Sequence, residues 1–85
     1  MKLLTVAAAA LNQTPLDWER NTRNILRALK LAKAEQVNLL CLPELCITGY
    51  GCEDTFHSPG VLQMAWRVLG EILPATRGMV VSVTV

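Results

Sequence analysis

The residue in this sequence that is best placed to do chemistry is Glu44. It follows a short apolar run at residues 38–42, and Pro43. The run has the pattern of a strand that is buried on both faces. Proline cannot donate a hydrogen bond to a sheet, so Pro43 predicts that the strand ends there. Reacting groups in open α/β sheets gather at the ends of strands, and Glu44 is therefore a candidate general base.

The neighbours of Glu44 predict how its proton affinity is set. Leu45, Cys46 and Ile47 would exclude water from the carboxylate, and desolvation raises the pKa of a carboxyl group and makes it a better proton acceptor. The alternative is that Glu44 caps a following helix or pairs with an arginine on the surface. The residue types alone leave both interpretations open, because perturbed acids mark functional sites only statistically.

Tyr50 is a second candidate, since it lies between Gly49 and Gly51. Glycine permits backbone angles that other residues resist, so the chain can turn sharply around the tyrosine. The ring could line a substrate pocket, or it could be a half-buried aromatic with a solvated hydroxyl. Glu53 and Asp54 lie too far along the loop to share the strand-end position, and we expect them to order the loop rather than to catalyse.

The three cysteines do not form a predicted metal site. Cys41, Cys46 and Cys52 have spacings unlike those of zinc ligands, and His57 is the only histidine. Cys41 is expected to be a small buried hydrophobic residue. Cys46 and Cys52 lie near Glu44 and could be mistaken for a nucleophile, but free cysteine is more often a packing residue.

The elements around these candidates predict an α/β fold in the order β-α-β-loop-α-β. Residues 3–11, 38–42 and 79–85 have strand patterns. Thr14, Pro15 and Asp17 predict the start of the first helix, and Ser58 with Pro59 predicts the start of the second, which Pro74 ends. The first helix carries an apolar stripe of Trp18, Thr22, Ile25, Leu29 and Ala32, widened by Leu26. The second helix carries a broad apolar face of Val61, Leu62, Ala65, Trp66, Leu69, Ile72 and Leu73. Since the sequence stops inside an apolar strand, residues 1–85 are expected to be part of a domain that continues.

Composition excludes several partners. The formal net charge is +1, which gives no field that attracts nucleic acid or an anionic membrane. The basic side chains of the first helix are expected to form a solvated face, because no aromatic or glycine-rich binding elements accompany them. No apolar run reaches the roughly 18 residues of a membrane span. We expect a cytoplasmic protein with neither nucleic acid nor membrane as a partner.

Two segments carry a resemblance to a known family. Leu42-Pro43-Glu44-Leu45 and Thr48-Gly49-Tyr50 resemble the strand-end signature of the nitrilase, or carbon–nitrogen hydrolase, superfamily. Gly49-Tyr50-Gly51-Cys52 and Ala10-Leu11-Asn12-Gln13 are more narrowly similar to the glutamine amidohydrolase domain of glutamine-dependent NAD synthetases of the eukaryotic type. Ala10 departs from the glutamine that many members of the superfamily have there. The resemblance, from about residue 6 to residue 73, implies the opening portion of a nitrilase-like α-β-β-α sandwich.

The resemblance implies acyl transfer from glutamine to a cysteine thiolate, with release of ammonia and then of glutamate. The family uses a glutamate as general base, a lysine that stabilises the oxyanion, and the nucleophilic cysteine. Glu44 matches the glutamate, and the resemblance implies that Tyr50 is a substrate-binding residue at the mouth of the pocket. Lys2, Lys30 and Lys33 do not match the family lysine, and the family cysteine lies beyond residue 85. The 85 residues alone are therefore expected to be inactive.

In relatives, the ammonia reaches a separate synthetase domain that uses ATP and magnesium to convert deamido-NAD to NAD, and the enzyme forms homo-oligomers. Two alternatives remain open. The chain could belong to a stand-alone nitrilase-family amidase that acts on another small amide or nitrile. It could also be a non-catalytic α/β fragment.

Overall fold

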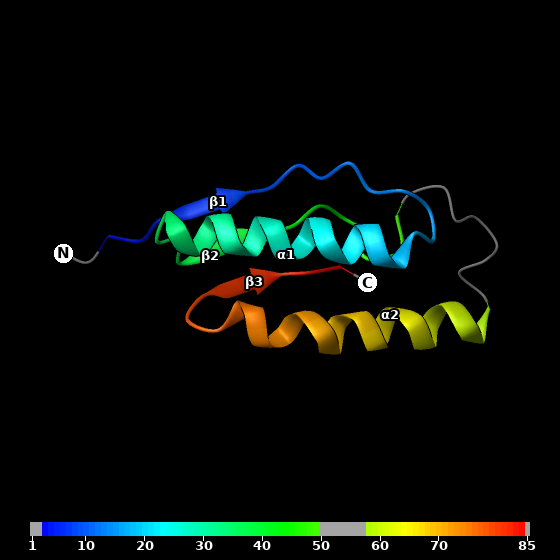
Figure 1. The fold of residues 1–85 in the computed structure, drawn as a ribbon. Helices are drawn as coiled ribbons and strands as arrows, with labels where there is room; N and C mark the ends of the chain where they lie inside the picture. Colours follow the sequence, from blue (N-terminus) through cyan, green and yellow to red (C-terminus); the bar gives the residue numbers. More distant parts are fainter. Residues whose placement is uncertain (1–2, 50–57, 85) are drawn as a thin grey trace.

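A computed structural model describes residues 3–49 and 58–84 of the chain. The elements follow in the order β1 (Val6–Ala8), α1 (Trp18–Ala34), β2 (Leu39–Cys41), α2 (Pro59–Ile72), the 3-10 turn η2 (Leu73–Thr76) and β3 (Val80–Ser82), as Figure 1 shows. The predicted α/β class and the order of elements are confirmed. Each strand is only three residues long, so the strand cores were found and their lengths were overestimated.

The three strands form a parallel sheet with β2 in the middle. The register places Ala8, Cys41 and Ser82 side by side at the carboxyl ends of the strands. Beyond the strands, Ala9 N donates to Cys41 O at 3.0 Å, and Leu42 N donates to Ser82 O at 3.1 Å. The carboxyl ends therefore meet at one edge, and the chain leaves β2 between its two neighbours.

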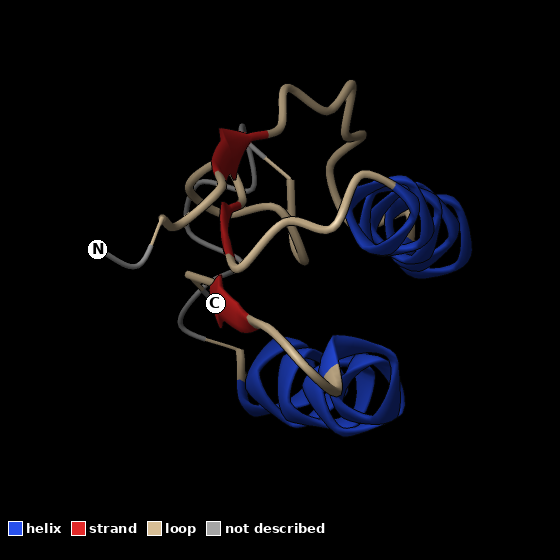
Figure 2. Cartoon of the chain, turned by 90° about the vertical axis from the view of Figure 1, so that its left-hand side faces the viewer, coloured by secondary structure: helices blue, strands red, loops and turns tan. Residues whose placement is uncertain are grey.

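One face of the sheet is covered by the two helices, which pack against each other on that side (Figure 2). Leu40, in the middle of β2, points toward the helices and is 3% exposed. Val6 and Val80 point to the other face and are 64% and 67% exposed. The prediction that β2 is buried on both faces is therefore wrong for the described chain, because only one layer of helices lies against it.

The same open face accounts for Cys41. The sequence predicted a small buried hydrophobic residue, but the side chain is exposed. Side chains alternate along a strand, so Leu40 faces the helices while Cys41 faces the uncovered side. The prediction is wrong because the apolar run indicated burial without indicating which face is covered.

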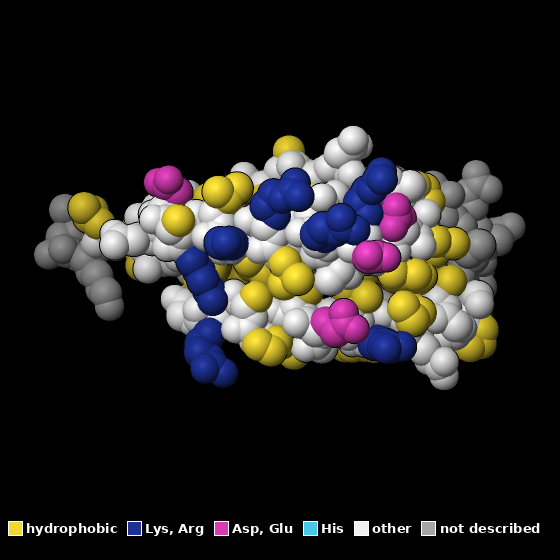
Figure 3. All heavy atoms as spheres, viewed as in Figure 1, with side chains coloured by type: hydrophobic (Ala, Val, Ile, Leu, Met, Phe, Trp, Pro, Cys, Tyr) yellow, Lys and Arg dark blue, Asp and Glu magenta, His cyan; other side chains and the backbone are white. Residues whose placement is uncertain are grey.

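The core lies between the sheet and the helices. Ile25 and Leu29 of α1 and Ile72 of α2 are fully buried. The predicted apolar stripe of α1 is confirmed along that line, but Leu26, which was expected to widen it, is 37% exposed. The predicted face of α2 was too broad, because Leu62 and Trp66 are 55% and 60% exposed. The lysines and arginines of α1 form an exposed face, as expected (Figure 3).

The start of α1 differs from the prediction. The N-cap is Asp17, whose Oδ1 accepts a hydrogen bond from Arg20 N at 3.1 Å. Thr14 was predicted to cap the helix and Pro15 to lie in its first turn, and this is wrong. Leu16 has φ of 58°, a left-handed conformation that no α-helix contains. In contrast, α2 begins where predicted, with Ser58 at the N-cap and Pro59 first in the helix.

The open face leads to a prediction for the isolated chain. A peptide of these 85 residues should show no sharp thermal transition by circular dichroism, because one face of its sheet is uncovered and β1 and β3 are edge strands in the described ranges. A sharp transition in the monomeric peptide would contradict this prediction and would favour an independent, non-catalytic α/β unit.

Candidate active site at the end of β2

Glu44 lies at the carboxyl edge of the sheet, at the start of a turn over residues 44–48 that follows β2. The strand end was predicted from Pro43, and the structure places Glu44 there. Its side chain is exposed. A carboxylate at this edge can accept a proton from a group bound above the strand ends. The role as general base remains a prediction.

The expected enclosure of Glu44 by its neighbours is wrong. Cys46 and Ile47 are fully buried in the core, and Leu45 is half-buried, while Glu44 is exposed. The turn directs the apolar side chains into the core and leaves the acid outside it. Within the described residues, these three side chains therefore do not exclude water from the carboxylate.

Leu45 has an unusual backbone conformation. Its φ is 53°, in the left-handed region, which costs about 1–2 kcal/mol for a residue with a Cβ atom. Such angles persist only where the surroundings enforce them. Here, Gly49 N donates to Leu45 O at 2.7 Å, which closes the turn. The residue next to the candidate base is thus held in a strained conformation.

Two amide side chains attach this turn to the rest of the fold. Gln13 Nε2 donates to Cys46 O at 2.6 Å and to Asn21 O at 3.1 Å. Asn21 Nδ2 donates to Ile47 O at 3.2 Å and to Thr14 O at 2.8 Å, and its Oδ1 accepts from Thr14 N at 2.9 Å. Asn21 is fully buried. We call Gln13 and Asn21 the amide clamp.

The loop before α1 also contacts the turn directly. Leu16 N donates to Thr48 O at 2.8 Å. Gly49 has φ of 83°, and a Cβ atom built on it would lie 2.7 Å from Thr14 O. The predicted sharp turn around Tyr50 lies outside the described residues, but Gly49 does adopt a backbone angle that favours glycine. The structure adds a reason for glycine that the sequence did not show, namely the close approach of a second backbone segment.

The amide clamp was missed by the sequence analysis. Asn21 was not among the candidates, although it lies three residues after Trp18 and four before Ile25, on the same face of α1. An amide within an apolar stripe is a signal of a buried, hydrogen-bonded side chain. Gln13 gave no comparable signal, because its partners lie 8 and 33 residues away in the sequence.

Several candidates cannot be placed. Tyr50, Gly51, Cys52, Glu53 and Asp54 lie outside the described residues. The proposed contribution of Tyr50 to substrate binding therefore stays a prediction.

Cys46 has the environment of a packing residue. It is fully buried, and burial raises the pKa of its thiol above the ordinary value of 9.0, partly offset by a backbone hydrogen bond. A thiol with a raised pKa is less ionised at neutral pH and is a poorer nucleophile. This environment supports the expectation that Cys46 packs rather than reacts.

We therefore predict that Cys46→Ala in the full-length protein leaves any hydrolytic kcat within about three-fold and lowers the free energy of unfolding by about 1–2 kcal/mol. Because the folded pKa is raised, the stabilising contribution of the neutral thiol is present below its unfolded pKa and is lost as pH rises through the folded value, above about pH 9. Urea unfolding of both proteins between pH 7 and pH 10 checks this. Loss of activity in a folded Cys46→Ala protein would contradict the packing role.

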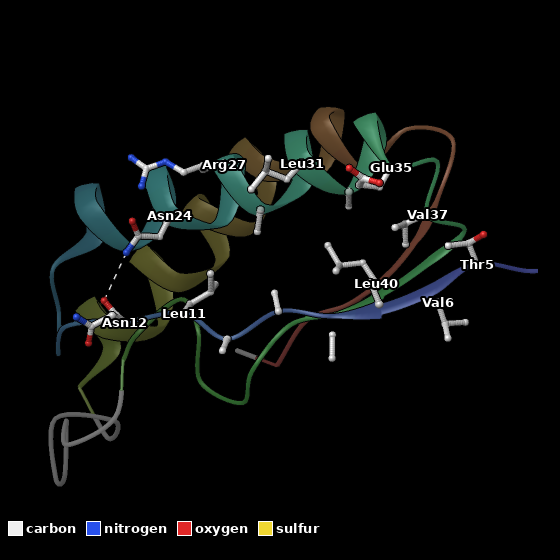
Figure 4. A pocket seen from close by; sticks show the side chains of 16 residues that line it. Thr5, Val6, Leu11, Asn12, Asn24, Arg27, Leu31, Glu35, Val37 and Leu40 are labelled. Atoms are coloured by element: carbon white, nitrogen blue, oxygen red, sulfur yellow. Dashed lines mark hydrogen bonds between the residues drawn. The ribbon is translucent and has the colours of Figure 1, made fainter.

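A groove of about 690 Å³ lies between α1 and the β1 segment (Figure 4). Figure 4 shows Leu40 pointing up toward α1 and Val6 pointing away from it. The groove is mainly apolar, and of its lining side chains only Arg27 and Glu35 are charged. Glu44 does not line it, so the groove is not the candidate active site.

The described ranges contain neither a candidate metal site nor a membrane-spanning helix. No group of three or more histidine, cysteine, aspartate or glutamate side chains there could hold a metal ion. Neither of the described helices is both long enough and apolar enough to cross a bilayer.

Comparison with known proteins places these features in a family. A family model described as carbon-nitrogen hydrolase matches residues 5–83. The chain is 44% identical over 73 residues to a glutamine-dependent NAD(+) synthetase of Arabidopsis thaliana, a match that covers 86% of this chain and 10% of that protein. It is 39% identical over 83 residues to the Saccharomyces cerevisiae enzyme of the same name, covering 95% of this chain and 12% of that protein.

The fold agrees with a solved relative. A crystal structure of a glutamine-dependent NAD(+) synthetase from Cytophaga hutchinsonii superposes with a TM-score of 0.89 at 49% sequence identity. The match covers 92% of this chain and 13% of that chain. The chain thus spans roughly a tenth to an eighth of the length of these relatives.

Proposed function

This chain belongs to the carbon–nitrogen hydrolase family, and we propose that it forms the N-terminal part of the glutaminase domain of a glutamine-dependent NAD synthetase. The observation that supports this most strongly is the likeness to the Cytophaga hutchinsonii enzyme, at 49% identity and a TM-score of 0.89 over 92% of the chain. The relatives are named for their use of glutamine and for NAD synthesis. Glu44 lies where such a domain would need a base, at the carboxyl edge of a parallel sheet.

In the proposed reaction, Glu44 accepts the proton of a cysteine thiol that lies outside residues 1–85. The thiolate attacks the side-chain carbonyl carbon of glutamine, the carbon–nitrogen bond breaks, and the nitrogen takes up a proton and leaves as ammonia. Water then attacks the thioester, Glu44 accepts a proton from that water, and glutamate and the free thiol are released. A lysine, also outside these residues, stabilises the oxyanion. Tyr50 contributes to the mouth of the glutamine pocket.

The proposal extends to the whole protein. The ammonia reaches a synthetase domain, where ATP with magnesium activates deamido-NAD and the ammonia displaces the activating group to form NAD. The protein works in the cytoplasm as a homo-oligomer. The names of the relatives, which pair glutamine with NAD synthesis, support the assignment of one activity to glutamine hydrolysis and the other to NAD synthesis.

The open face of the sheet fits this proposal. In an α-β-β-α sandwich, two sheets pack face to face about 10 Å apart. Val6, Leu39 and Val80 lie on the face that the helices leave uncovered. We propose that a second sheet of the same domain packs on these side chains, which would remove their apolar surface from water.

The test is an assay of the purified full-length protein with L-glutamine, ATP, magnesium and deamido-NAD. NAD should form in equal amounts to glutamate, and ammonium should replace glutamine as nitrogen donor. A stand-alone amidase would instead release ammonia from its own amide or nitrile substrate and would form no NAD with either donor. That second result would remove the synthetase proposal and keep the family.

A further inference from the structure

The direction of the Glu44 side chain must be set by the backbone of its turn. The side chain is exposed, so packing does not orient it. The ion pairs in the described ranges join Arg20 to Asp17, Arg23 to Glu19 and Arg67 to Glu71, and none of them includes Glu44. A carboxylate without such restraints can act reproducibly as a base only if its Cα atom and backbone are held in place.

The amide clamp supplies this restraint from two directions. Asn21 fixes the turn at Ile47 O, three residues after Glu44, and Gln13 fixes it at Cys46 O, two residues after Glu44. Asn21 uses both Nδ2 hydrogens and its Oδ1 in these bonds and those to Thr14, so its side chain has no rotational freedom left. The turn cannot shift along the sheet without breaking the buried bond to Ile47 O and the part-buried bond to Cys46 O, and a polar group that is left unpaired in a buried place is unfavourable.

The helix that carries Asn21 is itself fixed. Ile25 and Leu29, one and two turns further along α1, are fully buried against the sheet. The position of the turn is thus fixed relative to the packed core, and it does not depend on the loop alone. This matters because Leu45 is strained, and a strained turn without such attachment would relax and carry Glu44 with it.

We propose that Asn21, acting with Gln13, is a positioning residue for Glu44. The amide clamp holds the turn over residues 44–48 in the position from which the carboxylate reaches the reacting thiol. The inference rests on the proposed role of Glu44 as general base. It assigns a specific effect on the chemical step to two residues that hold the backbone of the turn.

The test uses the full-length protein with Asn21→Asp. Aspartate has the same shape and can still accept the hydrogen bond from Thr14 N, but it presents an oxygen to Thr14 O and Ile47 O in place of the two donated hydrogens. Misplacement of a catalytic group by about 1 Å can lower a rate by about 10²-fold. We expect kcat for glutamine hydrolysis to fall by about 10–100-fold, while KM for glutamine and NAD synthesis from ammonium stay within about two-fold of wild type.

A second variant covers the case in which Asn21→Asp does not fold. Gln13 is only half-buried. Gln13→Glu keeps the acceptor for Asn24 Nδ2, which lies 2.8 Å from Gln13 Oε1, and loses the donor to Cys46 O. It should show the same selective fall in kcat, of about 10-fold. A neutral Gln13→Met variant, which lacks the donor and adds no charge, should behave likewise.

The control is Leu29→Ala, which removes a buried side chain of the same helix and leaves the amide clamp intact. It should lower the midpoint of urea unfolding and leave kcat for glutamine hydrolysis by the folded protein within about two-fold of wild type. If folded Asn21→Asp and Gln13→Glu proteins show this pattern, a lowered midpoint with kcat unchanged, the amide clamp is structural only and the inference is overturned. If Glu44→Gln itself retains glutamine hydrolysis, the proposed base fails instead, whatever the clamp variants do.

Discussion

Replacing Glu44 by Gln in the full-length protein should lower kcat for glutamine hydrolysis by about 10²–10⁴-fold, the usual contribution of a positioned general base. NAD synthesis from added ammonium should remain, because ammonium does not require the thioester step. Glutamine keeps the size of the side chain and removes its ability to accept a proton. Glutamate release is measured with glutamine, and NAD formation is measured with glutamine and with ammonium. Together these measurements separate the two half-reactions.

The matched control for this prediction is Glu35→Gln. Glu35 is exposed and forms the C-cap of α1, and it does not belong to the turn after β2. The same carboxylate-to-amide change there should alter neither half-reaction. Retained glutamine hydrolysis in Glu44→Gln would remove Glu44 from the proposed mechanism, whereas loss of hydrolysis together with a lowered midpoint of urea unfolding would point to unfolding.

The part of the fold that sequence predicted well is the part that depends on local patterns. The β-branched and apolar runs identified all three strands, and the stripe through Ile25 and Leu29 identified the buried face of α1. The start of α1 was predicted wrongly because Leu16 adopts a left-handed conformation. Leucine has no local preference for that conformation. It is compatible here with the hydrogen bond from Leu16 N to Thr48 O, a contact that no local pattern contains.

The candidate site, like the fold, could be predicted only where it depends on local sequence patterns. The strand-end location of Glu44 followed from Pro43 and from the apolar run before it. The exposure of Glu44 could not be predicted in this way. The burial of both Cys46 and Ile47, which leaves Glu44 outside the core, depends on the turn at Leu45. The amide clamp depends on hydrogen bonds between segments up to 33 residues apart. A polar residue inside an apolar stripe was the one available clue, and it pointed to Asn21.

Gly49→Ala should be the most destabilising single methyl addition among the described glycines. The new Cβ atom would lie 2.7 Å from Thr14 O, 2.8 Å from Thr14 C and 2.9 Å from Pro15 N. These are backbone atoms, so no side chain can rotate away from the clash. Overpacking and the positive φ together should lower the free energy of unfolding by about 2–5 kcal/mol, and relief of the clash would move the turn that carries Glu44.

Two other glycines separate the effect of the positive φ from the effect of the clash. Gly78 has φ of 87° and no atom within 4 Å of its built Cβ, so Gly78→Ala tests the backbone angle without a clash and should cost about 1–2 kcal/mol. Gly70 lies in α2 with open space around it, and Gly70→Ala should stabilise by up to about 1 kcal/mol. Urea unfolding of the three full-length variants gives the order directly. If Gly49→Ala costs no more than Gly78→Ala, the backbone of the loop before α1 does not press against the turn at Gly49.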